Sequence, residues 1–297
     1  MVSSALLLFP DFAMIALGLL LRRLSTFEDS FWSGLEKLVY FVLFPCLLFN
    51  SIVATRFDFA AAGSMLLAAL AAIAAGALLG GFGRWWARDE RVWASAFQCA
   101  FRFNSYIALA IAGRLAGQTG VATMAILIGV GVPVCNAMAV TALARHSEHG
   151  LLRELSRNPL LIATSSALLL NVAGIGLPEV LSASLKRAGD ASIALGLIAV
   201  GAGLQLSAFG GSRRLVAWIT AVKLLALPAI ALGVGLALGL AGLQLQIAVL
   251  SAAMPTASSA YILAQRMGGD GRVVALLISI GTLLSAITVP AWLAIVS

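Results

Sequence analysis

One stretch of this chain is too long and too apolar to belong to a soluble domain. Between Lys223 and Arg266 there are 42 consecutive residues without a charged side chain. A helix needs about 20 apolar residues to cross a bilayer, so this interval holds two crossings, and Gly239, Gly242 and Gln244 mark the turn between them. The chain as a whole is also strongly apolar, since 61% of all residues are hydrophobic and only 10% are charged. These values indicate an integral membrane protein.

The apolar runs indicate helices and not a membrane β-barrel. A barrel strand alternates apolar and polar residues over about 10 positions, and runs such as residues 65–83 do not alternate. We therefore predict an all-α membrane protein with ten transmembrane helices, near residues 5–21, 38–53, 59–83, 92–113, 119–144, 158–177, 191–209, 215–237, 245–265 and 273–296.

Basic residues are unevenly distributed between the two sides of these spans. Loops that follow odd-numbered spans contain thirteen Lys and Arg residues, whereas the other loops contain four: Arg56, Arg114, Lys186 and Arg187. Cytoplasmic loops are the basic ones. We expect both termini outside the cell and a location in a bacterial-type inner (plasma) membrane. The net charge of +7 follows from this topology and does not indicate a nucleic-acid partner.

The two halves of the chain resemble each other. Three pairs recur at spacings of 155, 149 and 157 residues: Tyr106 with Tyr261, Pro10 with Pro159, and Pro133 with Pro290. Five spans (1–144) precede a basic cytoplasmic linker (145–157), and five spans (158–297) follow it. Because five is odd, the second half enters the membrane from the opposite side, which predicts two inverted five-helix repeats. Chance recurrence of proline and tyrosine in apolar sequence is the alternative.

Small polar residues and a proline interrupt the apolar pattern at corresponding places in the two halves. The fourth span contains Phe-Asn-Ser-Tyr at 103–106, and the ninth contains Met-Pro-Thr-Ala-Ser-Ser-Ala-Tyr at 254–261. A broken helix exposes backbone groups that lipid cannot satisfy, so such a break belongs in the protein interior. A half-helix that begins there presents free N–H groups, which favour an anion. Paired breaks of this kind are typical of a transporter's binding site.

Several short motifs, taken together, resemble the auxin efflux carrier family over the whole chain. They are Pro10 with Gly18 and Arg22-Arg23, Leu43-Phe44-Pro45 with Leu47-Leu48-Phe49, Val132-Pro133 with Asn136, Ala253-Met254-Pro255-Thr256-Ala257 with Tyr261, and Thr282-Leu283-Leu284-Ser285. The resemblance implies a fold similar to that of bile acid sodium symporters, with spans 4 and 9 broken and crossing near the midplane. It implies a scaffold of spans 1, 2, 6 and 7 that often dimerises, and a core of spans 3–5 and 8–10 that moves relative to it. Family members export auxin in plants, and bacterial relatives are linked to carboxylates such as malonate or malate.

The residues at the two breaks are the candidates for substrate contact. Pro255 lacks an amide hydrogen and cannot continue a regular helix, while the neighbouring hydroxyls can cap a helix or contact a ligand. The resemblance places an asparagine at the crossover, so we assign ligand contact to Asn104, with an interhelical hydrogen bond as the alternative. Tyr106 and Tyr261 either shape the cavity or pack between helices. The full candidate set is Arg102, Asn104, Ser105, Tyr106, Pro255, Thr256, Ser258, Ser259 and Tyr261.

Two basic residues lie inside predicted spans. Arg102 lies about ten residues into span 4, where a charge costs at least ~2.5–3.5 kcal/mol at the membrane centre. Its planar guanidinium suits a carboxylate, and a structural ion pair or snorkelling toward an interface is the alternative. Lys223 is either a second cation of the core or a side chain that snorkels to the interface.

The sequence does not identify the ion to which transport would be coupled. Asp11 is the only acidic residue clearly inside a predicted span, and both histidines, His146 and His149, lie in the central loop, which argues against a deep proton relay. A sodium site remains an alternative because carbonyl, amide and hydroxyl oxygens suit hard cations. The candidates for such a site, or for a supporting layer around the substrate, are Gln98, Asn104, Asn136, Lys223, Ser259 and Gln265.

No catalytic or metal chemistry is expected. The three cysteines, Cys46, Cys99 and Cys135, have no metal-ligand spacing and are expected to pack as small apolar side chains. The few polar residues show no nucleophile with a base, so we expect no enzyme activity, no cofactor and no bound metal.

These features together predict a secondary transporter of a small organic anion, working by elevator-type alternating access and forming a homodimer through its scaffold helices. The alternatives are a sodium-coupled symporter of an amphipathic organic anion and a non-transporting membrane sensor.

Overall fold

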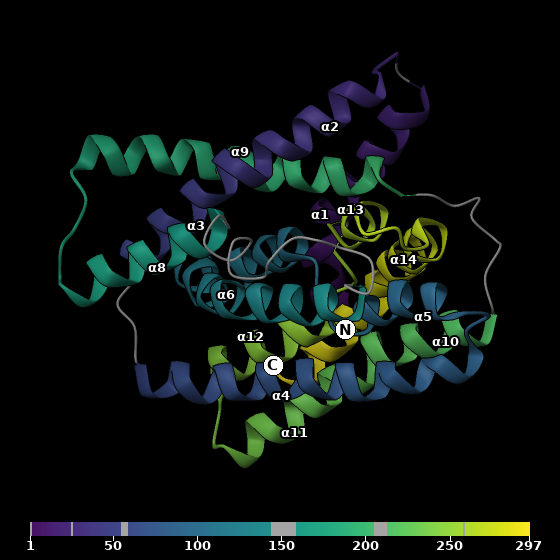
Figure 1. Cartoon of the computed structure of the whole chain (residues 1–297). Helices are drawn as coiled ribbons and strands as arrows, with labels where there is room; N and C mark the ends of the chain where they lie inside the picture. Colours follow the sequence, from purple (N-terminus) through teal and green to yellow (C-terminus); the bar gives the residue numbers. More distant parts are fainter. Residues whose placement is uncertain (1, 25, 55–58, 144–158, 205–212, 258) are drawn as a thin grey trace.

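The structure, a computed structural model, describes residues 2–24, 26–54, 59–143, 159–204, 213–257 and 259–297. These residues form helices and connecting turns, without a strand among them (Figure 1). The helices are α1 (Val2–Leu24), α2 (Asp29–Leu38), η1 (Val39–Leu43), α3 (Phe44–Val53), α4 (Phe59–Gly81), η2 (Phe82–Trp86), α5 (Glu90–Phe97), η3 (Gln98–Ala100), α6 (Ser105–Leu143), α8 (Pro159–Val172), α9 (Glu179–Ala202), α10 (Arg213–Ala221), η5 (Val222–Ala226), α11 (Leu227–Ala237), α12 (Gly242–Ala253), α13 (Ser259–Arg266) and α14 (Gly271–Ile295).

Five helical stretches of the described residues are long and apolar enough to cross a membrane. They are Asp29–Val53, Ala62–Trp86, Glu90–Leu143, Arg213–Ala237 and Gly271–Ile295. The 54 residues of Glu90–Leu143 exceed one crossing, and the chain interrupts or turns this stretch at two places. The first is at residues 101–104, and the second is a tight turn inside α6, where Gly117 has a φ of +54°. The turn lies between the predicted fourth and fifth spans.

Two of the long helices contain a π-helical turn, and a proline accounts for each. In α2–η1–α3 the amide of Phe44 donates to the carbonyl of Val39, and in α10–η5–α11 the amide of Leu227 donates to Val222. The next residue is Pro45 in one helix and Pro228 in the other. Proline has no N–H to continue the regular ladder, so the helix widens before it and then resumes. The second of these turns carries Lys223.

Two sets of contacting helices carry the names of the predicted scaffold and core, and contacts of α3 with α6 and of α1 with α14 join the two sets. In the scaffold group, α1 lies against α9, and α3 lies against α8 and α9. In the core group, α4 packs on α11 and α12, while α12 also contacts α6 and α14. Figure 1 shows α9 toward the top and α4 toward the bottom of the view, with α6 and α12 between them.

Two helices begin earlier than the sequence predicted. The helix predicted to begin at residue 38 begins at Asp29, and the helix predicted to begin at residue 191 begins at Glu179. Lys37, Lys186 and Arg187 therefore lie on helices and not in loops, and the predicted loop 22–37 shrinks to the connection between Leu24 and Asp29. These polar segments are helical for two reasons. An acidic residue lies in the first turn of each helix, Asp29 in α2 and Glu179 in α9. In α9, Lys186 also forms a salt bridge of 2.9 Å with Asp190, which follows it by one helical turn.

Two predicted spans also end too late. The span predicted over 158–177 ends at Val172, where the chain turns through Gly174 with a φ of +68°. The span predicted to reach residue 209 has its helix end at Ala202. The predicted linker 145–157, with His146 and His149, lies outside the described residues.

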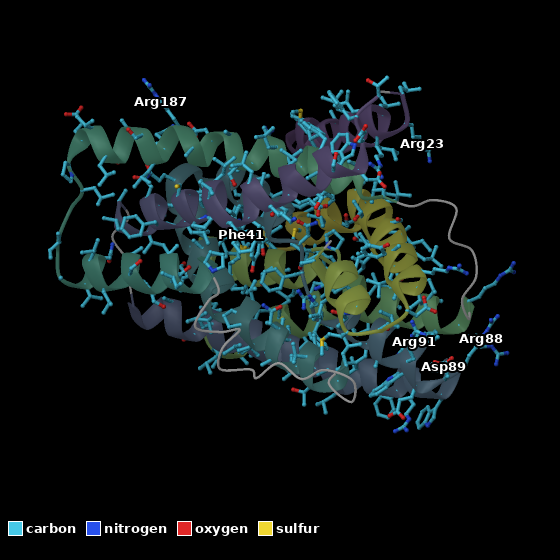
Figure 2. The ribbon with its side chains drawn as sticks, turned by 45° about the horizontal axis from the view of Figure 1, so that its top comes forward. Arg23, Phe41, Arg88, Asp89, Arg91 and Arg187 are labelled. Atoms are coloured by element: carbon cyan, nitrogen blue, oxygen red, sulfur yellow. The ribbon has the colours of Figure 1, made fainter. Side chains whose placement is uncertain are left out.

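Four basic residues on different parts of the chain lie at two ends of the molecule. Figure 2 shows Arg23, Arg88 and Arg91 at one end and Arg187 at the other. The first three follow odd-numbered predicted spans, and Arg187 follows an even-numbered one.

The start of α14 offers a test of the helix assignment. The Asp270 carboxylate accepts hydrogen bonds from the amides of Arg272 at 2.8 Å and Val273 at 3.2 Å. Because these amides have no partner inside the helix, we expect Asp270→Ala to destabilise the protein by about 1 kcal/mol. Thermal unfolding in detergent measures the effect. Asp190→Ala, which removes an exposed pair, should leave the midpoint nearly unchanged, and an equal loss in the two variants would contradict the cap.

Candidate functional site

The two predicted breaks face each other at the centre of the core group. One helix ends with η3 at Ala100 and resumes as α6 at Ser105, while the other ends with α12 at Ala253 and resumes as α13 at Ser259. Met254 is extended, with a ψ of 142°, so Pro255 lies in a true interruption and not in a kink. The amide of Asn104 donates to the carbonyl of Pro255 at 2.8 Å. We call residues 101–104 and 254–257 the crossing.

Side chains from each interrupted helix reach backbone or side-chain oxygens of the other. The Thr256 hydroxyl donates to the carbonyl of Cys99 at 2.9 Å. The Gln98 amide nitrogen donates to the carbonyl of Ala260 at 3.1 Å. The Thr256 bond satisfies a carbonyl at the interrupted end of η3, and the two bonds together hold the segments in a fixed mutual position.

Asn104 is only 1% exposed, and hydrogen bonds hold its side chain in one orientation. Its Oδ1 accepts from the amides of Tyr106 at 3.0 Å and Ile107 at 3.2 Å, which makes Asn104 the cap of α6. The cap fixes which end of the amide points away from the helix. The Nδ2 donor is buried and has no hydrogen-bond partner among the described residues. A buried donor of this kind is costly unless a ligand or water accepts from it.

Two other buried polar atoms near the crossing have no hydrogen-bond partner within the described part of the chain. They are Oε1 of Gln98 and Oγ1 of Thr282. Thr282 follows Gly281, where an added Cβ would lie 3.7 Å from Cβ of Pro255. Thr282 belongs to a motif that carried the family resemblance, but no sequence pattern predicts that it lies beside the break, which is about 27 residues away in the chain.

Both predicted core cations are buried. Arg102 is 6% exposed, and its Nη2 donates to the Ser259 hydroxyl at 3.0 Å, so it joins the two interrupted helices and does not snorkel. Lys223 is 3% exposed, and its Nζ donates to the carbonyl of Ala252 at 3.0 Å. Snorkelling is therefore also wrong for Lys223.

The remaining candidates take different places. Tyr106 packs between the two helix groups: its ring lies edge-on to Phe44, with centroids 4.7 Å apart, and it fills the space beside Gly196. Tyr261 is half-buried on α13 against the core, and Ser105 is half-buried at the start of α6.

Three further candidates are not placed at the crossing. Asn136 is half-buried on α6, and the described hydrogen bonds do not connect it to the crossing. Ser258 and the side chain of Gln265 lie outside the described part of the structure.

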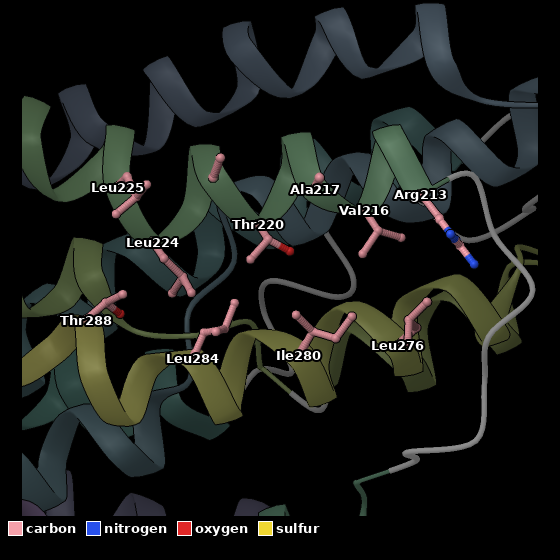
Figure 3. A pocket seen from close by; sticks show the side chains of 11 residues that line it. Arg213, Val216, Ala217, Thr220, Leu224, Leu225, Leu276, Ile280, Leu284 and Thr288 are labelled. Atoms are coloured by element: carbon pink, nitrogen blue, oxygen red, sulfur yellow. The ribbon is translucent and has the colours of Figure 1, made fainter.

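A large cavity lies elsewhere. It has a volume of about 620 Å³ and runs between α10–η5 and α14, as Figure 3 shows. Its lining is mainly apolar, with Arg213 at one end, and the exposed side chains of Leu225 and Leu284 border it. The cavity is therefore an apolar groove open to the molecular surface, and the polar atoms of the crossing do not line it.

The cysteines contribute packing and weak hydrogen bonds. Cys99 and Cys135 are buried, and their thiols face the carbonyls of Ser95 at 3.8 Å and Phe101 at 3.6 Å. Among the described residues, His, Cys, Asp and Glu side chains form no group of three or more that could hold a metal ion.

A comparison with known families tests the resemblance. A family model described as membrane transport protein matches residues 141–293, just over half of the chain. The chain belongs to the auxin efflux carrier family of membrane transport proteins. The resemblance predicted from the motifs is thus confirmed.

Relatives cover nearly the full length of this carrier. An uncharacterized transporter of Methanothermobacter thermautotrophicus is 24% identical over 287 residues, which span 94% of each chain. The uncharacterized transporter YfdV of Escherichia coli K12 is 24% identical over 300 residues, which span 96% of this carrier and 95% of YfdV. The family and these relatives indicate a transporter and not an enzyme.

Proposed function

We propose that this carrier is a secondary transporter of a small organic anion, a carboxylate, which binds at the crossing. The observation that carries the proposal is the Nδ2 donor of Asn104, which is buried, held in place by the cap and without a described partner. A carboxylate oxygen would accept from it. The start of α6 lies immediately beside this donor, so the positive end of the helix dipole favours the same negative charge.

The charge around the crossing agrees with an anionic substrate. Residues 98–104 and 251–260 contain Arg102 but no aspartate or glutamate. Lys223 adds a second buried positive group through its contact with Ala252. An anion would offset the cost of keeping these groups out of water, whereas a cationic substrate would be repelled.

Alternating access would come from movement of the core group against the scaffold group. The two groups meet at small residues: Gly196 on α9 accommodates the ring of Tyr106, and Gly129 on α6 lies against Thr164 on α8. Tyr106 is two residues from Asn104, so the proposed site lies next to the surface along which the groups would slide. We propose an elevator movement of this kind, in ten spans arranged as two inverted repeats with both termini outside.

The scaffold group also offers a surface for a second copy in the membrane. Phe41 and Val42 on the α2–η1–α3 helix and Leu169 on α8 are exposed. We propose a homodimer through these scaffold helices.

Uptake into proteoliposomes tests the proposed function. We expect saturable uptake, or exchange across preloaded vesicles, for at least one of radiolabelled acetate, malonate, malate and indole-3-acetate. Solid-supported-membrane currents with and without sodium or a proton gradient would show whether the movement is electrogenic. Exchange assays are included because electroneutral exchange gives no current.

Two variants connect the transport to the crossing. Asn104→Ala and Arg102→Gln should each lower uptake at least tenfold, which corresponds to about 1.4 kcal/mol. Arg187→Gln removes a basic residue from the exposed surface of α9 and should keep wild-type uptake. No uptake or exchange of any probe by folded protein would contradict the proposed function, and full uptake in both crossing variants would move the site elsewhere.

A further inference from the structure

The apolar groove between α10–η5 and α14 has one basic end. Its volume is about 620 Å³, and apart from Arg213 the described residues that line it are apolar or threonine. Figure 3 shows Arg213 and Leu276 at one end of the groove and Leu225 and Thr288 at the other. A volume of this size lies within the ~300–1,000 Å³ of ligand sites. The groove runs between two helical stretches that are long and apolar enough to cross a membrane.

The sequence explains both the presence and the length of the groove. Ala217 and Ala221 on α10 are exposed and end at Cβ, so they leave the space that larger side chains would fill. On α14 the lining residues recur every four positions, which places them along one side of the helix. From Leu276 to Thr288 this side is about 18 Å long at 1.5 Å per residue. One leaflet is about 15 Å deep, half of a ~30 Å hydrocarbon core, so the groove has the length of one acyl chain.

A second basic residue lies beyond the Arg213 end of the groove. Arg272 is exposed on α14 and precedes Leu276 by one helical turn, so it extends the lining side of that helix. The carboxylate of the neighbouring Asp270 accepts from the amides at the start of α14. Helices α10 and α14 both begin at this end, which adds the positive ends of two helix dipoles. Guanidinium groups suit a phosphate, and basic pockets between membrane helices are typical sites for anionic lipid headgroups.

We propose that this groove binds an anionic phospholipid, with the phosphate at the end marked by Arg213 and Arg272 and one acyl chain along α10–η5 and α14. A phospholipid matches the groove in both respects, because it joins a charged group to an apolar chain of one leaflet's length. A helix of a second copy would match the apolar walls and not the basic end. The inference needs the membrane location of this carrier but no particular substrate. In the proposed orientation the lipid belongs to the cytoplasmic leaflet.

Native mass spectrometry of delipidated protein tests the proposal. Dioleoyl phosphatidylglycerol and the zwitterionic dioleoyl phosphatidylcholine are added together in equal amounts, and the wild-type chain should retain the phosphatidylglycerol in preference. Arg213→Gln with Arg272→Gln should lower this retention about tenfold, because charge-assisted hydrogen bonds to the phosphate are lost. Ala221→Trp fills the groove and should lower it to a similar extent. Inorganic phosphate or dihexanoyl phosphatidylglycerol, which lacks long chains, should not displace the bound lipid.

Two matched variants separate the groove from its surroundings. Arg214→Gln removes an equal charge from the exposed residue next to Arg213, which does not line the groove, and Ala286→Trp adds an equal side chain to an exposed position of α14 outside it. Both should retain phosphatidylglycerol as wild type does. If Ala221→Trp does not fold, Ala221→Leu tests the chain part with a smaller filling.

Several results would overturn the proposal. Equal retention of the two lipids would show that the basic end does not select an anion, and equal losses in Arg214→Gln and Arg213→Gln would indicate a general surface charge. Displacement by inorganic phosphate would indicate an anion site without an acyl chain. Wild-type retention in a groove-filling variant would place the lipid elsewhere, and if that variant also lost a dimer on size-exclusion chromatography, a second copy would be the occupant of the groove.

Discussion

Asn104→Asp should abolish anion transport while the protein keeps its fold. Aspartate has nearly the shape of asparagine, and its carboxylate can accept from the amides of Tyr106 and Ile107 as Oδ1 of Asn104 does. Asparagine and aspartate cap helices about equally well. The two side chains differ at the second terminal atom, where the buried Nδ2 donor of Asn104 is replaced by a negatively charged carboxylate oxygen. The variant therefore changes the sign of the group offered to the substrate and little else.

The size of the effect follows from the charges. Two like charges about 4 Å apart interact by roughly 4 kcal/mol at an effective dielectric constant of about 20. The lost hydrogen bond to a charged acceptor adds about 1.5–3 kcal/mol. Since about 1.4 kcal/mol corresponds to a factor of ten, uptake in proteoliposomes should fall at least a hundredfold.

A buried asparagine in the scaffold group provides the matched control. Asn50 on α3 is 5% exposed, and its Oδ1 accepts from the Ser182 hydroxyl at 2.9 Å. Asn50→Asp adds the same charge to the same membrane protein, away from the crossing, and should retain transport in the fraction that folds. Equal losses in the two variants would mean that buried charge alone disrupts the protein, and the role of Asn104 in substrate contact would then be rejected.

The positions of the two interruptions could be predicted because they depend on local chemistry. Pro255 lacks the N–H that a helix needs, and Asn104 prefers a cap to a helix interior, so each break is encoded where it occurs. The apolar runs were predicted for a similar reason, since their length reflects the thickness of the bilayer.

Helix starts in polar sequence were harder to predict. Residues 29–37 and 179–190 have the composition of loops, and only pairs such as Lys186 with Asp190 stabilise them as helices. Such pairs are worth a few tenths of a kcal/mol each and give a weak signal in sequence. Both starts were therefore placed about ten residues too late.

The partners of the site residues could not be predicted at all. The contact of Lys223 with Ala252 depends on how η5 packs on α12, and the proximity of Gly281 to Pro255 depends on how α14 packs on the crossing. The place of the Tyr106 ring could not be predicted for the same reason. Whether its ring lines a cavity or packs between helices was decided by Phe44 and Gly196, which come from two other helices.

Gly201→Ala should be among the most destabilising single substitutions in this carrier. An added Cβ at Gly201 would lie 1.8 Å from the carbonyl oxygen of Ile15, and one at Gly18 would lie 2.0 Å from the carbonyl oxygen of Ile198. These neighbours are backbone atoms and cannot move aside by changing a rotamer. Helices α1 and α9 therefore touch backbone to backbone, as small residues allow in membranes, and a methyl group must push them apart.

Separation of α1 and α9 would loosen the contact that holds the scaffold group together. Overpacking of a well-packed interior commonly costs about 1–3 kcal/mol, and a clash with rigid backbone at this distance should cost at least the upper value. Gly233→Ala is the matched control, because an added Cβ on this glycine of α11 meets no atom within 4 Å. Alanine favours helix by about 1 kcal/mol over glycine, so this control should be slightly stabilised. Thermal unfolding and the monodisperse fraction on size-exclusion chromatography measure both variants. Equal unfolding temperatures for Gly201→Ala and wild type would contradict the backbone contact between α1 and α9, and with it the rigid scaffold against which the core is proposed to move.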